Sequence, residues 1–159
     1  MHHGTPIAAI RRSPAQWTDR HAVVQGWVRT RRDSKAGISF VNLSDGSCFD
    51  ALQLVVPNTL ANYASEVLRL TAGCSVEAEG KLVATQGKDG STGVEMQVER
   101  LHVYGFVDDP DTYPIQPKAH TMEFLREQAH LRARTNTFGA LGRLRHTMAQ
   151  AVHRWFSDN

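Results

Sequence analysis

Apolar and polar residues alternate along most of the first two thirds of the chain, as they do in β-strands with one buried face. The predicted strands cover residues 21–30, 38–43, 48–56, 74–84 and 94–104. One face of the first strand is expected to carry Val24, Gly26, Val28 and Thr30. One face of the second is expected to carry Ile38, Phe40 and Asn42, and its other face Ser39, Val41 and Leu43. Turn-forming residues fill the stretches 33–37 and 44–47, which therefore close two hairpins.

The spacing of apolar residues changes between the third and fourth strands, where it predicts a helix. Pro57 ends the strand, Asn58 or Thr59 can cap a helix, and Gly73 stops it. The apolar positions of this helix are Leu60, Tyr63, Ala64, Val67, Leu68 and Leu70. Three strands, one helix and two strands follow one another in the OB-fold, a five-stranded Greek-key barrel that commonly binds oligonucleotides on strands two and three. The sequence therefore predicts a mainly β domain of this class.

The first hairpin combines positive charge with an aromatic side chain. Its cations are Arg29, Arg31, Arg32 and Lys35, and Phe40 lies on the opposing strand. Guanidinium groups neutralise phosphates, and an exposed ring offers an unpaired base a surface for stacking, so the hairpin suits a single-stranded nucleic acid. The alternative from the same residues is an ordinary solvated strand with a phenylalanine in the core.

Several stretches resemble the amino-terminal part of asparaginyl-tRNA synthetases, which are class II aminoacyl-tRNA synthetases. They read GWVRTRRDSKAGISFVNLSDGSC, LQLVV and YPIQPKAHTMEFLREQAHLRARTNTFGALGRLRHTMAQAVH, and the resemblance covers the chain from about residue 23 to its end. Related aspartyl and lysyl enzymes share the GW/RR hairpin but lack the TRRDSKAG and YPIQPK wording. In that family the OB-fold binds the anticodon loop of tRNA, and a separate antiparallel-sheet domain carries out ATP-dependent activation of the amino acid.

The resemblance also implies roles for individual residues. Phe40 corresponds to the aromatic that stacks on the central uridine of the anticodon, Gln53 to the amide that bonds the uridine's edge, and Arg32 to an arginine at the same base or its phosphate. Asparagine and aspartate anticodons share that uridine, so the third base must separate them. Glu95 and Gln97 in the fifth strand are candidates for that contact. Further expected contacts to the anticodon come from Arg29, Arg31 and Lys35.

Beyond the predicted barrel the pattern changes again. Residues 1–106 are expected to form the OB-fold, 107–123 a linker rich in proline and acidic residues, and 124–159 the helical start of an α+β catalytic domain. From Asn136 onward, one apolar stripe at helical spacing comprises Phe138, Leu141, Leu144, Met148, Val152 and Trp155. In the resembled family this helix belongs to the first class-defining motif at a homodimer interface. A helix packed on its own barrel would show the same stripe.

Composition limits the remaining possibilities. The net charge is only +2, so any nucleic-acid surface must arise from local clustering. Cys48 and Cys74 match no metal-binding spacing and are expected as reduced thiols, and the eight histidines form no metal motif. The glycine-rich stretch 87–93 lacks the spacing of a phosphate-binding loop and is expected as a hairpin loop. No apolar run has transmembrane length and no secretory signal is evident, which favours the cytoplasm.

The ATP-binding motifs of class II synthetases do not occur in this sequence. We therefore expect a portion of a larger asparagine–tRNA ligase that binds asparagine tRNA, without catalytic residues, metal or cofactor of its own. The resemblance implies ATP and Mg²⁺ for the full-length enzyme. The alternatives are a piece of an aspartyl or non-discriminating enzyme, and a free-standing OB-fold that binds single strands without sequence preference.

Overall fold

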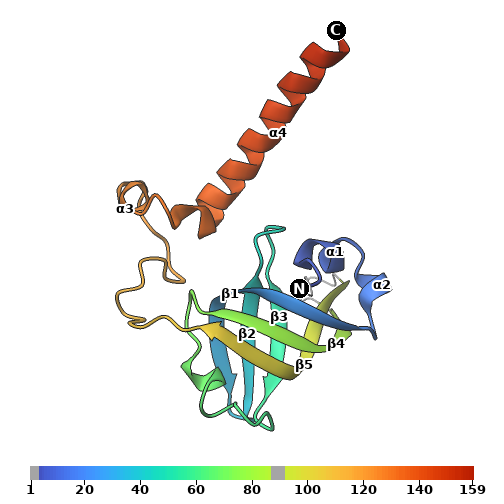
Figure 1. The fold of residues 1–159 in the computed structure, drawn as a ribbon, viewed down its shortest axis with the longest axis vertical. Helices are drawn as coiled ribbons and strands as arrows, with labels where there is room; N and C mark the ends of the chain where they lie inside the picture. Colours follow the sequence, from blue (N-terminus) through green and yellow to red (C-terminus); the bar gives the residue numbers. More distant parts are fainter. Residues whose placement is uncertain (1–3, 87–91) are drawn as a thin grey trace. The chain divides into compact units, whose positions relative to one another are not determined.

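The computed structural model describes residues 4–86 and 92–159 (Figure 1). The chain divides into two compact units, Met1–Tyr113 and Pro114–Asn159, and each is described by itself below. The division falls inside the stretch predicted as a linker. Val107, at the start of that stretch, packs against the core of the first unit.

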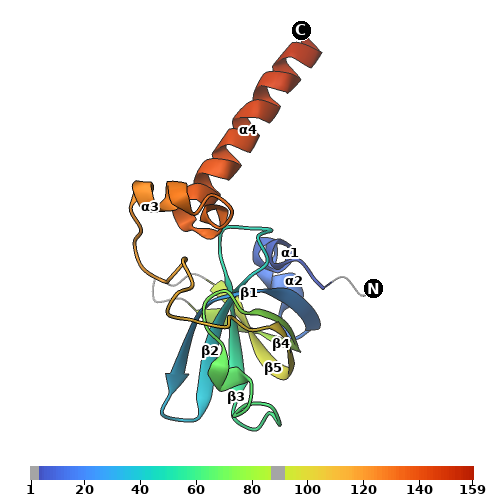
Figure 2. The same ribbon diagram turned by 60° about the vertical axis from the view of Figure 1, so that its left-hand side comes forward.

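The first unit is a closed barrel of five strands, as the sequence predicts (Figures 1 and 2). The strands are β1 (His21–Ser34), β2 (Ile38–Ser44), β3 (Leu52–Pro57), β4 (Ser75–Gln86) and β5 (Thr92–Gly105). They are hydrogen-bonded in the order β1-β2-β3-β5-β4, and β4 closes the barrel against β1. Among the described strands, β3 and β5 pair in parallel and the other neighbours pair antiparallel.

Strand β1 is long because it serves two partners in turn. Its first half, from His21 to Trp27, pairs with β4, and its second half, from Trp27 to Ser34, pairs with β2. Gly26 lies at this change of partner. A Cβ atom there would lie 2.6 Å from the main-chain oxygen of Ser44, so the two strands can approach as they do only at a glycine.

The alternation that predicts β1 breaks at Arg29, where the register against β2 shifts as in a β-bulge. Val28 is paired with inward-facing Leu43, but Thr30 is paired with outward-facing Asn42. The expectation that Val28 and Thr30 share a face is therefore wrong. Beyond the bulge, Thr30 and Arg32 face outward, while Arg31 pairs with Val41 on the inward side.

The core lies inside the barrel and consists mainly of apolar residues from all five strands, completed by residues that precede β1 and by residues between β3 and β4. Its largest fully buried side chains are Ile7, Ile10, Val24, Val28, Val41, Leu43, Leu52, Leu54, Val56, Leu70, Leu82 and Met96. On β2 the predicted faces are confirmed, since Ser39, Val41 and Leu43 are buried. Cys74 also lies in the core, Cys48 packs partly against it, and both are free thiols.

Two short helices precede the barrel and were not expected from the sequence: α1 (Ile7–Arg12) and α2 (Pro14–Trp17). Ile7 and Ile10 of α1 are fully buried in the barrel core. The helix is capped from a distance, because Asp45 and Ser47 of the β2–β3 connection accept hydrogen bonds from the backbone N–H groups of Ile7 and Ala8 at 2.8 and 2.9 Å. Two isoleucines three positions apart were the available signal for this helix.

The helix predicted between the third and fourth strands is wrong. The chain there forms turns and a single 3₁₀ helix, η1 (Val67–Arg69), with hydrogen bonds that mix spacings of three, four and five residues. Val67 and Leu70 are buried as the spacing predicts, but Leu68 is exposed. A helix this short is only marginally stable alone, so side-chain contacts to other strands determine the backbone path. One of these is the hydrogen bond of 2.9 Å from Asn62 to the carbonyl of Leu101.

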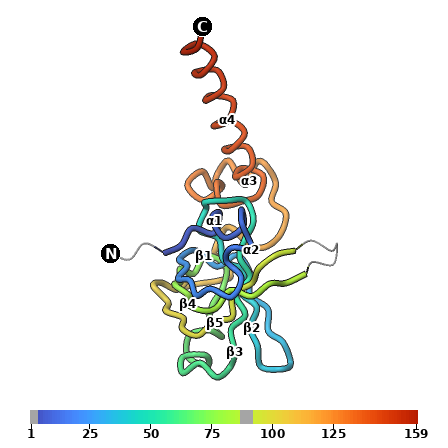
Figure 3. The backbone as a smooth tube through the Cα atoms, turned by 90° about the vertical axis from the view of Figure 1, so that its right-hand side faces the viewer, coloured from blue at the N-terminus to red at the C-terminus, as the bar shows by residue number. Residues whose placement is uncertain are grey.

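The second unit contains α3 (Met122–Glu127), η2 (Arg132–Arg134) and α4 (Asn136–Asp158). Figure 3 traces α4 as one continuous helix, as predicted from Asn136 onward. Thr121 and Thr135 cap α3 and α4 by accepting hydrogen bonds from the backbone N–H groups of Phe124 and Phe138. Five of the six predicted stripe residues are 42–61% exposed: Leu141, Leu144, Met148, Val152 and Trp155. Phe138, the sixth, is partly covered and lies under the guanidinium of Arg132, 4.7 Å away.

Candidate nucleic-acid interface

Arg32 and Phe40 form a cross-strand pair on the outer face of the β1–β2 hairpin. The two residues are register partners, and the Arg32 guanidinium lies 5.2 Å from the centre of the Phe40 ring. Phe40 is neither in the barrel core nor fully exposed. This arrangement exposes part of a flat aromatic ring beside a fixed positive charge, which is the combination that binds a base together with its phosphate.

Gln53 lies diagonally from Phe40 on the same outer face, because Phe40 pairs with Val55 and Gln53 pairs with Asn42. Diagonal neighbours of this kind are about 7–8 Å apart, so one base can touch both side chains. The amide nitrogen of Gln53 donates to Glu95 of β5 at 3.0 Å, and that of Gln97 donates to the other oxygen of the same carboxylate at 3.0 Å. The structure thus joins Gln53, Glu95 and Gln97 into one cluster.

The basic residues of the hairpin differ in their surroundings. In the part of the chain that the structure describes, Arg32 and Lys35 form no ion pair with a carboxylate. Arg29 occupies the bulge. Arg31 instead has a side chain only 21% exposed, lies 3.3 Å from Asp33 and donates to the carbonyl of Val67 at 2.8 Å. The pattern of charges in the sequence did not distinguish Arg31 from its neighbours, because the bulge decides which of them face outward.

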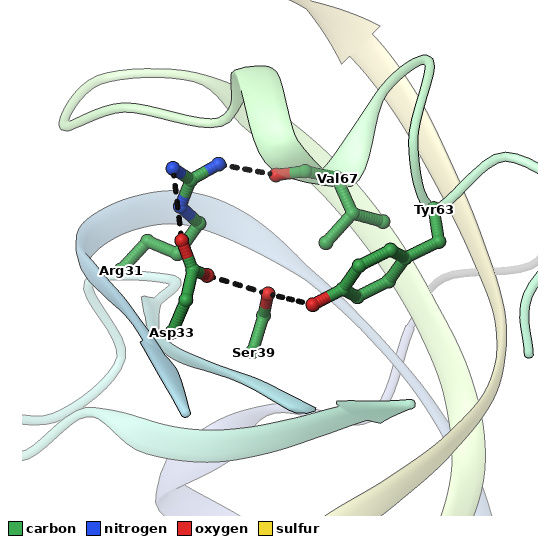
Figure 4. A network of polar contacts seen from close by, with 5 residues as sticks. All are labelled: Arg31, Asp33, Ser39, Tyr63 and Val67. Atoms are coloured by element: carbon green, nitrogen blue, oxygen red, sulfur yellow. Dashed lines mark hydrogen bonds and ion pairs between the residues drawn. The ribbon is translucent and has the colours of Figure 1, made fainter. Parts of the chain in front are cut away.

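Beneath the hairpin lies a polar network that the sequence analysis missed (Figure 4). Ser39 is fully buried, donates to Asp33 at 2.7 Å and lies 2.8 Å from the hydroxyl of Tyr63. Arg31 completes the network through Asp33 and Val67. A serine at an inward position of an apolar strand was the signal, since a buried hydroxyl needs a partner.

The outer face of β1, β4 and β5 carries a second polar cluster. Gln25 donates to Glu77 at 2.6 Å, and Tyr104 donates to the same carboxylate oxygen at 2.7 Å. The hydrogen bond from Gln25 lowers the pKa of Glu77, and the bond from Tyr104 lowers it further. The same bond raises the pKa of Tyr104, because losing its proton would remove the donor beside a carboxylate.

Among residues 4–86 and 92–159, no three His, Cys, Asp or Glu side chains gather in a way that could hold a metal ion. Within the same ranges, no helix is long and apolar enough to cross a membrane. The predicted hairpin loop of residues 87–93 lies mostly outside the described residues, which resume at Thr92.

The chain is similar in sequence to known proteins. The tRNA anticodon family model, described as an OB-fold nucleic acid binding domain, matches residues 22–104, which is more than half of the 159 residues. The asparagine–tRNA ligase of Myxococcus xanthus is 66% identical over 135 residues, covering 85% of this chain and 28% of that protein. The asparagine–tRNA ligase of Idiomarina loihiensis is 60% identical over 140 residues, covering 88% of this chain and 30% of that protein. The resemblance to asparaginyl-tRNA synthetases is thereby confirmed, and the chain spans less than a third of these relatives.

Solved structures agree on the fold. Asparaginyl-tRNA synthetase from Pyrococcus horikoshii matches with a TM-score of 0.79 at 24% identity, covering 98% of this chain and 35% of that one. The Entamoeba histolytica enzyme in complex with asparaginyl-adenylate matches with a TM-score of 0.74 at 25% identity, covering 89% and 34%. The barrel, its outward-facing hairpin and the family match lead to one conclusion: this chain belongs to the family of OB-fold nucleic acid binding domains of the tRNA anticodon type.

Proposed function

We propose that this chain is the anticodon-binding portion of an asparagine–tRNA ligase and that its partner is asparagine tRNA. The observation that carries the proposal is the shared outer face of Arg32, Phe40 and Gln53, which lie on three adjacent strands. Sequence identities of 60–66% to asparagine–tRNA ligases support the choice of tRNA. In this proposal Phe40 stacks on the central anticodon uridine, while Arg32, Lys35 and Arg29 meet phosphates.

Glu95 explains how Gln53 could select uridine. A carboxylate only accepts hydrogen bonds, so it holds the Gln53 amide with its nitrogen toward Glu95. One N–H and the carbonyl oxygen remain for a base. Uracil offers a carbonyl to the N–H and its ring N–H to the oxygen, whereas the ring nitrogen of cytosine has no proton to donate. A contact of Glu95 or Gln97 with the third anticodon base remains a prediction beside this role.

The complete reaction is proposed for the full-length enzyme. It joins asparagine to tRNA at the expense of ATP and would use Mg²⁺, and we assign these ligands to the part of the enzyme beyond the residues described above. Here the chain contributes recognition, since binding the anticodon loop positions the tRNA for the catalytic domain. Because tRNA charging serves translation, the proposal includes a cytoplasmic location.

The proposal also includes a homodimer, with the exposed stripe on α4 as part of its interface. An apolar face of this kind is usually covered by a partner. Replacing Leu144 and Met148 by Glu should abolish any self-association measured by light scattering, while the barrel keeps its melting temperature. Self-association that survives both substitutions would contradict the assignment.

Binding of an anticodon stem-loop tests the main proposal. The chain should bind the asparagine stem-loop more tightly than the same stem-loop with its central uridine changed to cytidine. A stem-loop with an aspartate anticodon keeps the uridine and separates the asparagine enzyme from an aspartyl or non-discriminating one. Equal affinity for the uridine and cytidine forms would overturn the proposed recognition and favour a general single-strand binder.

A further inference from the structure

We propose that Asp33, Ser39 and Tyr63 are positioning residues that hold Arg32 and Phe40 in the arrangement that binds RNA. The inference rests on the proposed function, because positioning these two side chains matters only if they meet RNA. None of the three residues needs to touch the ligand. They act from beneath the hairpin, through the strands that carry the binding pair (Figure 4).

The second half of β1 needs such support because it is an edge. The ladder to β4 ends at Trp27, and the main chain of Val28 still bonds to Gly73 and Cys74, whereas from Thr30 to Ser34 the strand pairs with β2. Among the described strands, none lies on its other side. An edge strand is held by one ladder of hydrogen bonds, so it can twist or separate more readily than a central strand. Arg32 lies on this edge, and its geometry therefore depends on what else holds the strand.

The network supplies that second attachment. Arg31 donates to the carbonyl of Val67 at 2.8 Å and lies 3.3 Å from Asp33, so the segment after β3 contacts the edge in place of a neighbouring strand. Tyr63, in the same segment, reaches Ser39 of β2 at 2.8 Å. Both strands of the hairpin are thus joined to the irregular segment that the sequence had predicted as a helix.

The hydrogen bonds run in one direction. The carboxylate of Asp33 only accepts, so the single hydroxyl proton of Ser39 is donated to it at 2.7 Å. Ser39 is then an acceptor toward Tyr63, whose hydroxyl must be the donor. The chain therefore reads Tyr63 to Ser39 to Asp33. Removing the Tyr63 hydroxyl deletes its first donor and leaves the other bond in place.

The register connects this chain to the binding pair. Asp33 and Ser39 are cross-strand partners, and the next pair along the ladder is Arg32 and Phe40. Successive residues of a strand point to opposite faces of the sheet. Asp33 and Ser39 therefore face the inner side, and the neighbouring pair, Arg32 and Phe40, faces the outer side. Fixing the first pair fixes the backbone, and with it the distance between the guanidinium and the ring.

Two matched substitutions test the inference in the whole chain. Tyr63→Phe removes the donor at the start of the network, and Tyr104→Phe removes a hydroxyl that donates to Glu77 on the other face. Binding of the asparagine stem-loop, measured by fluorescence anisotropy, should weaken about three- to tenfold in Tyr63→Phe, as expected for the loss of one hydrogen bond. It should not change in Tyr104→Phe. Unchanged binding in Tyr63→Phe would overturn the inference.

A double-mutant cycle shows whether Tyr63 acts through the binding pair. If it does, Tyr63→Phe should have a smaller effect on binding once Phe40 is replaced by Ala, because only Arg32 is then left to position. The same loss in both backgrounds would mean that Tyr63 supports the fold or the RNA by another route, and the inference would fall. If Tyr63→Phe is partly unfolded at the assay temperature, Asp33→Asn replaces it in the cycle, because Asn keeps an acceptor oxygen for Ser39 and loses the charge opposite Arg31.

Amide hydrogen exchange in the absence of RNA separates this inference from the proposed function. Residues 30–34 and 38–41 should exchange faster in Tyr63→Phe than in the parent, while residues 94–104 stay unchanged. If the parent binds no stem-loop but the exchange difference appears, the proposed function fails and only the mechanical role of the network stands. If the parent binds and exchange is the same in both proteins, the positioning role fails while the proposed function stands.

Discussion

Two outer faces of the barrel share strand β1 and treat their charges in opposite ways. On the face of β1, β4 and β5, Lys81 lies 2.8 Å from Asp19 and Arg100 contacts Glu79, and the neighbouring imidazole of His21 lies 2.9 Å from the carboxylate of Glu99. On the β1–β2 hairpin, Arg32 and Lys35 form no ion pair among the described residues. Arg32 lies over an aromatic ring instead.

On the face of β1, β4 and β5 the polar side chains bond to one another, whereas on the hairpin Arg32 and Lys35 have no carboxylate partner among the described residues. Gln25, Glu77 and Tyr104 bond to one another, so a ligand would have to replace existing hydrogen bonds. A phosphate gains little from a cation that is already paired, whereas an unpaired cation neutralises the phosphate and releases the counterions condensed on the RNA. The hairpin face is therefore the one that the physical chemistry favours for RNA, although both faces contain aromatic, amide and charged side chains.

Removing the Phe40 ring from the hairpin should have the largest effect on RNA binding. Phe40→Ala should weaken binding of the asparagine stem-loop by about ten- to a hundredfold, because stacking contributes about 1–3 kcal/mol per base. The barrel should survive, since Phe40 lies outside its core. Phe49→Ala is the matched control, because Phe49 is 46% exposed in the β2–β3 connection, away from the hairpin pair. Titrations followed by fluorescence anisotropy measure the affinity of both variants. Equal losses of affinity in Phe40→Ala and Phe49→Ala would contradict a specific role for the hairpin ring.

The next effect concerns the stability of the barrel and Gly26, where β1 changes its partner from β4 to β2. Gly26→Ala should lower the free energy of unfolding by about 1–3 kcal/mol, because the added Cβ overpacks against the main chain of Ser44. Gly93→Ala, where the added atom would meet Thr85 at an ordinary 3.5 Å, is the control in β5. Urea unfolding of both variants measures the difference. Equal stability of the two would show that β1 does not need a glycine where it changes partners.

Removing single positive charges should affect RNA binding differently on the two faces. Arg32→Ala and Lys35→Ala should each reduce stem-loop affinity, and each lost phosphate contact should make the negative slope of log K against log salt less steep by about 0.7. Arg100→Ala, which removes a cation already paired with Glu79, should leave both quantities unchanged. The measurement is a series of binding titrations at increasing salt. A loss in Arg100→Ala as large as in Arg32→Ala would contradict the role given to pairing.

The smallest expected effect concerns the outer face of β1, β4 and β5. The lowered pKa of Glu77 contributes stability above the ordinary glutamate value of about 4.3, and this is lost as the pH falls through the lowered pKa. The raised pKa of Tyr104 contributes stability below the ordinary tyrosine value of about 10, lost as the pH rises through the raised pKa. Tyr104→Phe should therefore be less stable than the parent between these limits, and the difference should shrink at both ends. Urea midpoints measured across this range test it, and a difference independent of pH would contradict it.

The strands and the kinds of side chain on the hairpin surface could be predicted from the sequence alone. Period-two alternation predicted the inward positions of β2, because a strand with one buried face has no other way to place its side chains. The turn residues of 33–37 and 44–47 marked where β1 and β2 end, and Gly37 and Gly46 in these turns have φ values of 73° and 79°. The resemblance to asparaginyl-tRNA synthetases singled out Arg32, Phe40 and Gln53, and the register brings these three to one face.

Contacts between residues distant in sequence fixed the remaining features of the fold. The shift at Arg29 turns Arg31 inward and Arg32 outward, and no local pattern announces a bulge that depends on the partner strand. Residues 58–72 bury Val67 and Leu70 but do not form the predicted α-helix, because Tyr63 and Val67 bond to the hairpin. The α1 helix forms because Asp45 and Ser47 cap it from the β2–β3 connection and its isoleucines complete the core. In each case a short segment has too little local free energy to fix its own conformation, so the strands packed against it make the choice.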